Sequence, residues 1–381
     1  MSGKKWWSEN DTEKYNSIAV PVFLLNKNAE PEWANEAAQS MVQNEGEALK
    51  FGGFSFLQEV STKFDKKSQN QLVYFSVMLA GTLRNFMAAP VFEKVKLCGM
   101  VVTACCDKQP KKDAQPTEET ARMIAAFAHQ TRAPLSTMFS ALAGLSRCND
   151  ELCDPDIHEY ISKISLQSFR LLRTSANITA LQSYEHGISS FAPKRQSLTL
   201  FLEQLCRVVS VRMQWRGVQF NFSVPSDDIL VSFDADKIAE VLLNLFSNAA
   251  KFAGEDGKIM VKLSLSESYA IITVEDNGIG ISPKVFPNVF KPYFSHDPKT
   301  ESICGDGIGL TLCRLIILEH KGLIAISSCE GKGTEVKLFL PLCTEENNST
   351  LTVSDIANDY MSDRFSKMYV ILSDVCPPPK L

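Results

Sequence analysis

Three short stretches that combine asparagine, aspartate and glycine follow one another in the C-terminal half of this chain. They run Asn244-Leu-Phe-Ser-Asn248-Ala-Ala-Lys251-Phe252, then Asp276-Asn-Gly278-Ile-Gly280, then Gly305-Asp-Gly307-Ile-Gly309. Side-chain amides can supply oxygen ligands for Mg²⁺, and glycine-rich backbone at the start of a helix offers free amide groups to phosphate. The three stretches therefore point to a site for a phosphorylated ligand and a hard cation.

The first stretch is expected to lie on a helix over 236–251. Asn244 and Asn248 are four residues apart and so share one face, while the leucines around them and Phe246 form the opposite, apolar face. An amide oxygen on such a face can hold a cation. The alternative is an ordinary amphipathic helix with two solvated asparagines, and the helix alone does not decide between the two.

The second and third stretches could shape the rest of the pocket. Asp276 ends an apolar strand, where its carboxylate could accept a hydrogen bond from the amino group of adenine. Gly278 and Gly280 would let the backbone pass close to a purine. The run 305–309 is not a dinucleotide fingerprint, because its spacing is G-x-G-x-G and no strand leads directly into it. A strand followed by a glycine turn is the simpler alternative.

A histidine upstream carries a different kind of chemistry. His129 is followed by Arg132 and Pro134 on a helix expected over 117–148. A neutral imidazole can attack a γ-phosphate in line, with the protein mainly positioning the groups and neutralising charge. A lone histidine on an amphipathic helix is more often only a surface residue. A function for His129 can therefore be inferred only together with the residues around it.

Two long amphipathic helices are expected to position this histidine. Apolar residues recur at helical spacing over 117–148 and again from Pro155 to about Gly187, with a turn between. Neither stripe can be buried by the hairpin alone. The simplest solution is a homodimer in which two hairpins form a four-helix bundle. The alternative is a hairpin docked against its own C-terminal domain.

The remaining sequence predicts two further regions and a tail. Over 193–344 the pattern is α/β, with helices at 198–212, 236–251 and 310–319 and strands at 218–224, 230–233, 258–264, 269–276, 323–328 and 335–340. Residues 1–107 predict a strand at 19–25, a helix starting near Trp33 and strands at 81–91 and 95–105. The tail 345–381 has no assigned role, although 367–372 could add a strand.

The order and spacing of the motifs resemble those of sensor histidine kinases of the two-component signalling family, over about residues 117–344. The resemblance implies a phospho-acceptor hairpin at 117–187 and, at 193–344, an ATP-binding α/β sandwich with a mixed sheet, as in gyrase-type ATPases and Hsp90-type chaperones. Residues 1–107 resemble a PAS sensor domain more weakly, because that fold has no fixed chemical motif. A small domain that only makes dimer contacts is the alternative there.

The resemblance also implies roles for single residues. Asn248 would hold Mg²⁺, Asn244 would lie near the phosphates, Lys251 would pair with phosphate charge, and 283–304 would form a mobile lid anchored by aromatics. The implied nucleotide contacts come from the helix, the glycine loops, the lid and the closing hairpin: Asn244, Asn248, Lys251, Phe252, Asp276, Gly278, Gly280, Phe290, Gly305, Gly307, Gly309 and Thr334. The implied catalytic group is His129 with Gln130 and Arg132.

Two positions depart from the family pattern. Gln130 stands directly after the histidine, where an acidic residue is usual. A carboxylate can take the imidazole proton, and such help is typically worth on the order of 10²–10⁴ in rate. Ala133 replaces a Thr or Asn that is thought to position water for dephosphorylating the partner. Autokinase activity and phosphatase activity are therefore both in question, the second more than the first.

Composition sets broader limits. The net charge of -5 and pI near 5.7 give no electrostatic reason to expect nucleic acid. The longest apolar run, 72–83, is too short to span a membrane, and the N-terminus lacks a signal-peptide core. These limits predict a cytoplasmic protein, and the resemblance implies a kinase that transfers the γ-phosphoryl of ATP to His129 and then to an aspartate of a response regulator receiver domain. The alternative is an ATP-binding signalling scaffold that has lost autokinase activity.

Overall fold

The computed structural model describes residues 6–16, 18–45, 57, 72–79, 82–93, 96–105, 135, 138–142, 144–145, 155–253, 256–294, 306–342 and 366–376. His129, Gln130, Arg132, Gly305 and the linker 108–116 lie outside these ranges. Among the described residues, no helix has the length and hydropathy that crossing a membrane needs.

The helices and strands follow one another in a fixed order along the chain. They are α1 Glu9–Asn16, β1 Val22–Asn26, β2 Pro31–Ala34, α2 Glu36–Glu45, β3 Leu72–Leu79, β4 Thr82–Glu93, β5 Lys96–Cys105, α5 Pro155–Glu185, β6 Lys194–Ser197, α6 Leu198–Gln214, β7 Gln219–Ser223, β8 Leu230–Phe233, α7 Ala235–Phe252, β9 Lys258–Leu265, β10 Tyr269–Asp276, η3 Phe286–Asn288, α8 Gly309–Glu319, β11 Leu323–Cys329, β12 Gly333–Pro341, α10 Lys367–Ile371 and η4 Leu372–Asp374.

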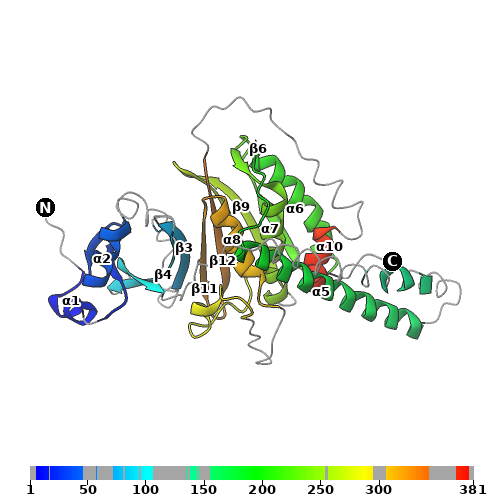
Figure 1. Cartoon of the computed structure of the whole chain (residues 1–381), viewed down its shortest axis with the longest axis horizontal. Helices are drawn as coiled ribbons and strands as arrows, with labels where there is room; N and C mark the ends of the chain where they lie inside the picture. Colours follow the sequence, from blue (N-terminus) through cyan, green and yellow to red (C-terminus); the bar gives the residue numbers. More distant parts are fainter. Residues whose placement is uncertain are drawn as a thin grey trace.

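A mixed sheet forms the centre of the C-terminal α/β region. Its strands lie in the order β11-β12-β10-β9-β7; β7 and β9 are parallel and the other neighbours are antiparallel. Helices α6, α7 and α8 lie together on one side of this sheet (Figure 1). This is the mixed α/β architecture that the sequence predicts, with each of the three predicted helices within a few residues of its place.

Helix α7 is the most deeply buried of these helices. Eleven of its residues are buried, including Leu242, Leu243 and Phe246. Asp234 begins the helix, because its side chain accepts a hydrogen bond from the Lys237 amide. The buried face fixes the rotation of the helix about its axis, and this rotation decides which polar side chains of α7 can face outward.

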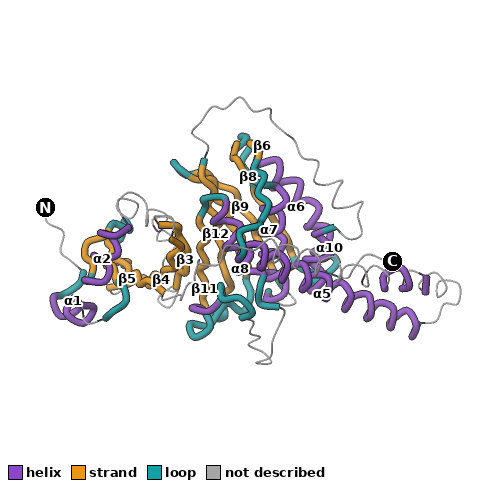
Figure 2. Tube along the Cα trace, viewed as in Figure 1, coloured by secondary structure: helices purple, strands orange, loops and turns teal. Residues whose placement is uncertain are grey.

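Strand β3 joins the N-terminal sheet to the C-terminal sheet. It pairs with β4 on one side and with β11 on the other, so the described strands other than β6 and β8 form one ten-stranded sheet (Figure 2). Alternate side chains of β3 point to opposite faces: Tyr74 packs in the cluster beneath α7, and Phe75 packs with Phe86 in the N-terminal cluster. The sequence reading missed this strand, treating 72–83 only as an apolar run.

The N-terminal region corrects one prediction. The helix expected to start near Trp33 begins at Glu36, and Trp33 lies in β2, opposite Leu24 of β1. The reason is Asn35, whose Oδ1 accepts a hydrogen bond from the Ala38 amide and so caps α2. Strands β1, β4 and β5 correspond to the predicted ones, whereas α1, β2 and β6 were not predicted.

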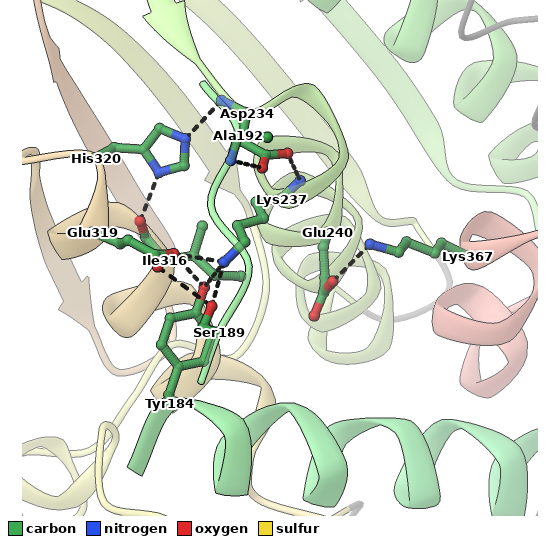
Figure 3. Close-up of polar contacts among 10 residues, drawn as sticks. All are labelled: Tyr184, Ser189, Ala192, Asp234, Lys237, Glu240, Ile316, Glu319, His320 and Lys367. Carbon is green, nitrogen blue, oxygen red and sulfur yellow. Dashed lines mark hydrogen bonds and ion pairs between the residues drawn. The ribbon is translucent and has the colours of Figure 1, made fainter. Parts of the chain in front are cut away.

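The second hairpin helix, α5, docks against the C-terminal α/β region. Its last turns meet α8 through Leu181, which is buried with Ile308 and Leu312. The Lys237 ammonium lies 2.6 Å from the Glu319 carboxylate and also donates to the hydroxyls of Tyr184 and Ser189 (Figure 3). These contacts join α5, α7 and α8. The first hairpin helix is described only at 135, 138–142 and 144–145, all helical as predicted.

The C-terminal segment 366–376 contradicts its prediction. A strand was expected at 367–372, but residues Lys367–Ile371 form helix α10 and Leu372–Asp374 a 3₁₀ turn. Short apolar runs do not separate strand from helix by themselves, and packing decides. Here Met368 and Ile371 are buried in the core beneath α7, while Val370 packs with Phe139 and Phe169 of the hairpin.

We predict that Asn35→Ala will loosen the N-terminal region. Asn35 is fully buried; its Oδ1 accepts from the Val22 and Ala38 amides, and its Nδ2 donates to three backbone carbonyls. Leaving such groups unpaired should cost at least about 2 kcal/mol. Hydrogen exchange of the β1 and α2 amides should rise accordingly. Gln39→Ala, which removes an exposed bond on the same helix, is the control. Equal hydrogen exchange in the two variants would contradict the role of Asn35 in holding β1 and α2 together.

Candidate nucleotide site

A cavity of about 440 Å³ opens where α7, the end of β10 and the start of α8 come together. This volume lies within the usual range for sites that hold a small molecule. Its walls are largely apolar, formed by residues such as Leu245, Val274 and Ile281, with a few polar groups among them. The three motif stretches, which are well separated in the sequence, meet in this cavity.

Helix α7 contributes one wall. Asn248, Lys251 and Phe252 line the cavity, whereas Asn244 is buried one turn earlier on the same face. The Asn244 amide donates to the Glu240 carbonyl at 3.0 Å, and its Oδ1 lies 3.3 Å from Nη2 of Arg173. Asn248 is therefore the α7 asparagine that lies at the cavity surface, and Asn244 is buried one turn before it.

Asp276 closes the other end of the cavity. Its Oδ1 accepts hydrogen bonds from the amides of Gly278 at 2.9 Å and Thr334 at 3.3 Å. Both bonds go to one oxygen, so within the described structure Oδ2 is left for a donor from a ligand. Burial raises the pKa of Asp276 to about 6, although the two amide bonds oppose the shift. A carboxylate held this way suits the amino group of a purine.

Glycines let the backbone close in around the cavity. A Cβ atom at Gly278 would overlap the Phe252 carbonyl oxygen, and one at Gly309 would lie 3.1 Å from Asn244 Oδ1. Gly307 has a φ of 65°, in the left-handed region that favours glycine, and an added Cβ would lie 2.6 Å from the Phe294 carbonyl. Larger residues at these points would fill or distort the space.

Eight of the predicted nucleotide contacts line the cavity: Asn248, Lys251, Phe252, Asp276, Gly280, Gly307, Gly309 and Thr334. Gly278 and Asn244 lie directly behind this wall. Phe290 does not reach the cavity. Phe290 is buried against the ring of Tyr74, with ring centroids 5.1 Å apart. At this position the predicted lid segment therefore contributes a core residue and not a contact in the cavity.

The sequence reading missed several residues that line the cavity. Arg173 comes from α5, and Asp374 from the C-terminal segment. Asp306 was quoted only as part of the glycine run, yet its Oδ2 accepts a hydrogen bond from Asn177 of α5 at 2.7 Å. No local motif marks Arg173 or Asp374, because each reaches the site only through the packing of a distant segment.

The donor set fits an adenine nucleotide with Mg²⁺. Asp276 offers an acceptor at one end, and the glycine run before α8 leaves space at the other, next to the amides of a helix start. Arg173 also lines the cavity and brings a guanidinium group to it. Asn248 would supply one oxygen ligand to the metal, since Mg²⁺ bound to a nucleotide takes most of its ligands from phosphates and water.

Most of the cavity lining lies in a region that is similar to known proteins. Residues 233–344 match the family model described as histidine kinase-, DNA gyrase B-, and HSP90-like ATPase. Sensor histidine kinase WalK of Bacillus subtilis is 28% identical over 61% of this chain. Adaptive-response sensory kinase SasA of Synechococcus sp. is 31% identical over 58% of this chain. The chain spans 38% of the length of WalK and 59% of that of SasA.

A solved structure covers most of this chain. Histidine kinase ThkA, in a complex with the response regulator protein TrrA, covers 90% of this chain and 100% of its own. It is 19% identical, with a TM-score of 0.42.

We predict that adenine recognition will depend on pH through Asp276. With its pKa near 6, the carboxylate is ionised above that pH and protonated below it, so affinity should be highest at neutral pH and lost as the pH falls. Adenosine is the suitable probe because it carries no phosphate that titrates in this range. Its affinity should fall about tenfold between pH 8 and pH 5.

Asp276→Asn is the matched variant for this prediction. It should bind adenosine more weakly than the wild type and show no step near pH 6. Calorimetric titrations at several pH values measure both properties. A wild-type affinity that stays flat from pH 8 to pH 5 would contradict the role given to Asp276.

Proposed function

Because this chain carries an ATPase domain of the histidine kinase type and has sensor histidine kinases as relatives, we propose that it is an ATP-dependent protein-histidine kinase. The observation that carries the proposal is the cavity at which Asn248, Asp276 and the Gly307–Gly309 turn converge. This arrangement can recognise a base at one end and a polyphosphate at the other, which suits ATP as phosphoryl donor.

The reaction assigns a separate task to each group of residues. Asp276 and the Gly278–Gly280 turn would hold the base, and Asn248 would hold Mg²⁺ while Lys251 balances phosphate charge. Bound Mg²⁺ would supply charge neutralisation at the phosphates. We propose that the His129 imidazole accepts the γ-phosphoryl group, with Gln130 orienting the ring and Arg132 offering positive charge nearby. Gln130 cannot take the imidazole proton, so we expect a slow reaction.

We also propose that the hairpin dimerises. Several large apolar side chains on the free half of the hairpin are exposed, among them Leu145 at 54%, Ile164 at 45% and Leu171 at 57%. They lie beyond the turns of α5 that dock on α8. A second copy of the chain would cover these side chains in a four-helix bundle. The contacts between the last turns of α5 and α8 would be kept.

The proposed partner of the phosphorylated protein is a separate response regulator with a receiver-domain aspartate. This follows from the family relationship, since the relatives are named as sensor kinases. We place the activity in the cytoplasm, where ATP is supplied. Residues 1–107 are proposed to be a PAS-like input region whose sheet is continuous with the ATPase sheet through β3.

A second candidate function is a signalling scaffold that binds ATP but does not autophosphorylate. Gln130 and Ala133 favour it, because both replace groups that take part in the chemistry of the family. The docked position of α5 also favours it, since Arg173 and Asn177 tie this helix to the ATPase region. In the scaffold, nucleotide would act as a conformational ligand.

Labelling with γ-³²P-ATP and Mg²⁺ distinguishes the histidine kinase from the scaffold. The wild type should acquire acid-labile, base-stable label, His129→Ala should acquire none, and Gln130→Glu should label at least about tenfold faster because a general base is restored. His186→Ala is the control, as His186 lacks the acceptor-box neighbours. Absence of label in both the wild type and Gln130→Glu would contradict the kinase and favour the scaffold.

A further inference from the structure

The C-terminal segment 366–376 reaches the nucleotide cavity. Its Lys367 pairs with Glu240 of α7 at 3.1 Å (Figure 3). The Arg216 guanidinium donates to the Val375 carbonyl at 3.1 Å, and Val370 packs with Phe139 of the hairpin. At its end Asp374 lines the cavity. The segment therefore holds a carboxylate at the rim of a site built for a polyanion.

Asp374 is paired with two arginines of α5. Its Oδ2 lies 2.6 Å from Nη1 of Arg173, and its Oδ1 lies 3.3 Å from Nε of Arg170. Arg170 is 43% exposed at its side chain and lies outside the cavity lining, whereas the Arg173 side chain is 9% exposed and lines the cavity. Arg173 is thus the buried partner that the segment holds within the site.

Arg173 lies at the phosphate end of the cavity. Its Nη2 is 3.3 Å from Asn244 Oδ1, the same atom that an added Cβ at Gly309 would approach. Gly309 begins α8, whose free amide groups favour phosphate. Asp276, the proposed base acceptor, is at the other end. The position of Arg173 therefore matches the polyphosphate and not the purine.

The charges around the cavity favour a role for Arg173. Among the described lining residues the cationic side chains are Arg173 and Lys251, against the carboxylates of Asp276, Asp306, Glu330 and Asp374. A triphosphate placed here needs cations beyond its metal ion. Arg173 lines the cavity, and its Nη atoms contact Asp374, Ser247 and Asn244, so a phosphate that binds this guanidinium would have to take the place of the Asp374 carboxylate.

We propose that Arg173 is a ligand for the phosphates of the nucleotide and that the segment 366–376 inhibits this contact by presenting Asp374 as an internal competitor. The inference rests on the proposed function, because it assumes that the ligand is ATP. With the segment docked, Arg173 is neutralised and a carboxylate faces the phosphates. When the segment leaves, the guanidinium becomes available and the repulsion disappears.

Competition of this kind must act in both directions. If the docked segment lowers the affinity for Mg·ATP by some factor, Mg·ATP must weaken docking of the segment by the same factor. Adenosine has no phosphates and should do neither. The difference between ATP and adenosine therefore separates competition at Arg173 from a general effect of the segment on the fold.

The test is a calorimetric comparison of Mg·ATP and adenosine. Asp374→Asn keeps the size of the side chain and should tighten Mg·ATP binding about tenfold, while adenosine affinity changes less than about twofold. Arg173→Gln should weaken Mg·ATP binding by a similar factor without affecting adenosine. In the double variant the gain from Asp374→Asn should largely disappear, because Asp374 and the phosphates no longer have an Arg173 guanidinium to compete for.

Glu203→Gln is the charge-matched control. Glu203 pairs with the exposed Arg207 on α6, so its loss removes one negative charge away from the cavity and should leave both affinities unchanged. As a second readout on the wild type, hydrogen exchange at 366–376 should increase when Mg·ATP is added and stay constant with adenosine.

The outcomes separate this inference from the proposed function. If neither the wild type nor Asp374→Asn binds adenosine or Mg·ATP, the nucleotide site itself is wrong. If both ligands bind but Asp374→Asn leaves Mg·ATP affinity unchanged or weaker, only the competition is overturned. Protection of 366–376 by Mg·ATP, instead of increased exchange, would overturn it as well.

Discussion

The packing of helix α7 is the constraint on which the rest of the structure depends. One face of α7 is buried against the sheet, with Leu242, Leu243 and Phe246 at its centre. Burial of this many apolar side chains fixes both the rotation of the helix about its axis and its position along the sheet. Asn248 and Lys251 face the cavity as a consequence. The same helix anchors α5 and α8 through Lys237 and the C-terminal segment through Glu240.

The charged groups around the cavity determine which ligands it can bind. Burial raises the pKa of Asp276, a cost that a ligand donor at Oδ2 would offset. At the opposite end the described lining residues offer two cations for a polyphosphate, Arg173 and Lys251, and Arg173 is held by Asp374. In the proposed orientation, the described residues provide an acceptor for the base and only part of the positive charge that the phosphates need. Affinity for ATP should therefore respond to metal ion and to the position of the C-terminal segment.

Local patterns carried most of what could be predicted from the sequence. The glycine runs, the paired asparagines of α7 and the strand that ends at Asp276 each have a short-range signature, and the structure brings the described ones together around one cavity. Elements defined by tertiary contact could not be predicted. Strand β3 is specified by pairing with β11, α10 by burial against α7 and the hairpin, and the contact between Arg173 and Asp374 spans 201 residues.

ATP with its metal ion is proposed to bind between the α7 face and the Gly307–Gly309 turn. Calorimetric titration of the intact chain with ATP, in the presence and absence of Mg²⁺, tests it most directly, with Asn248→Ala as the variant. We expect one site per chain, tighter binding when Mg²⁺ is present, and loss of that Mg²⁺-dependent gain in Asn248→Ala. Absence of ATP binding in the wild type, or a Mg²⁺ effect that persists in Asn248→Ala, would contradict the account.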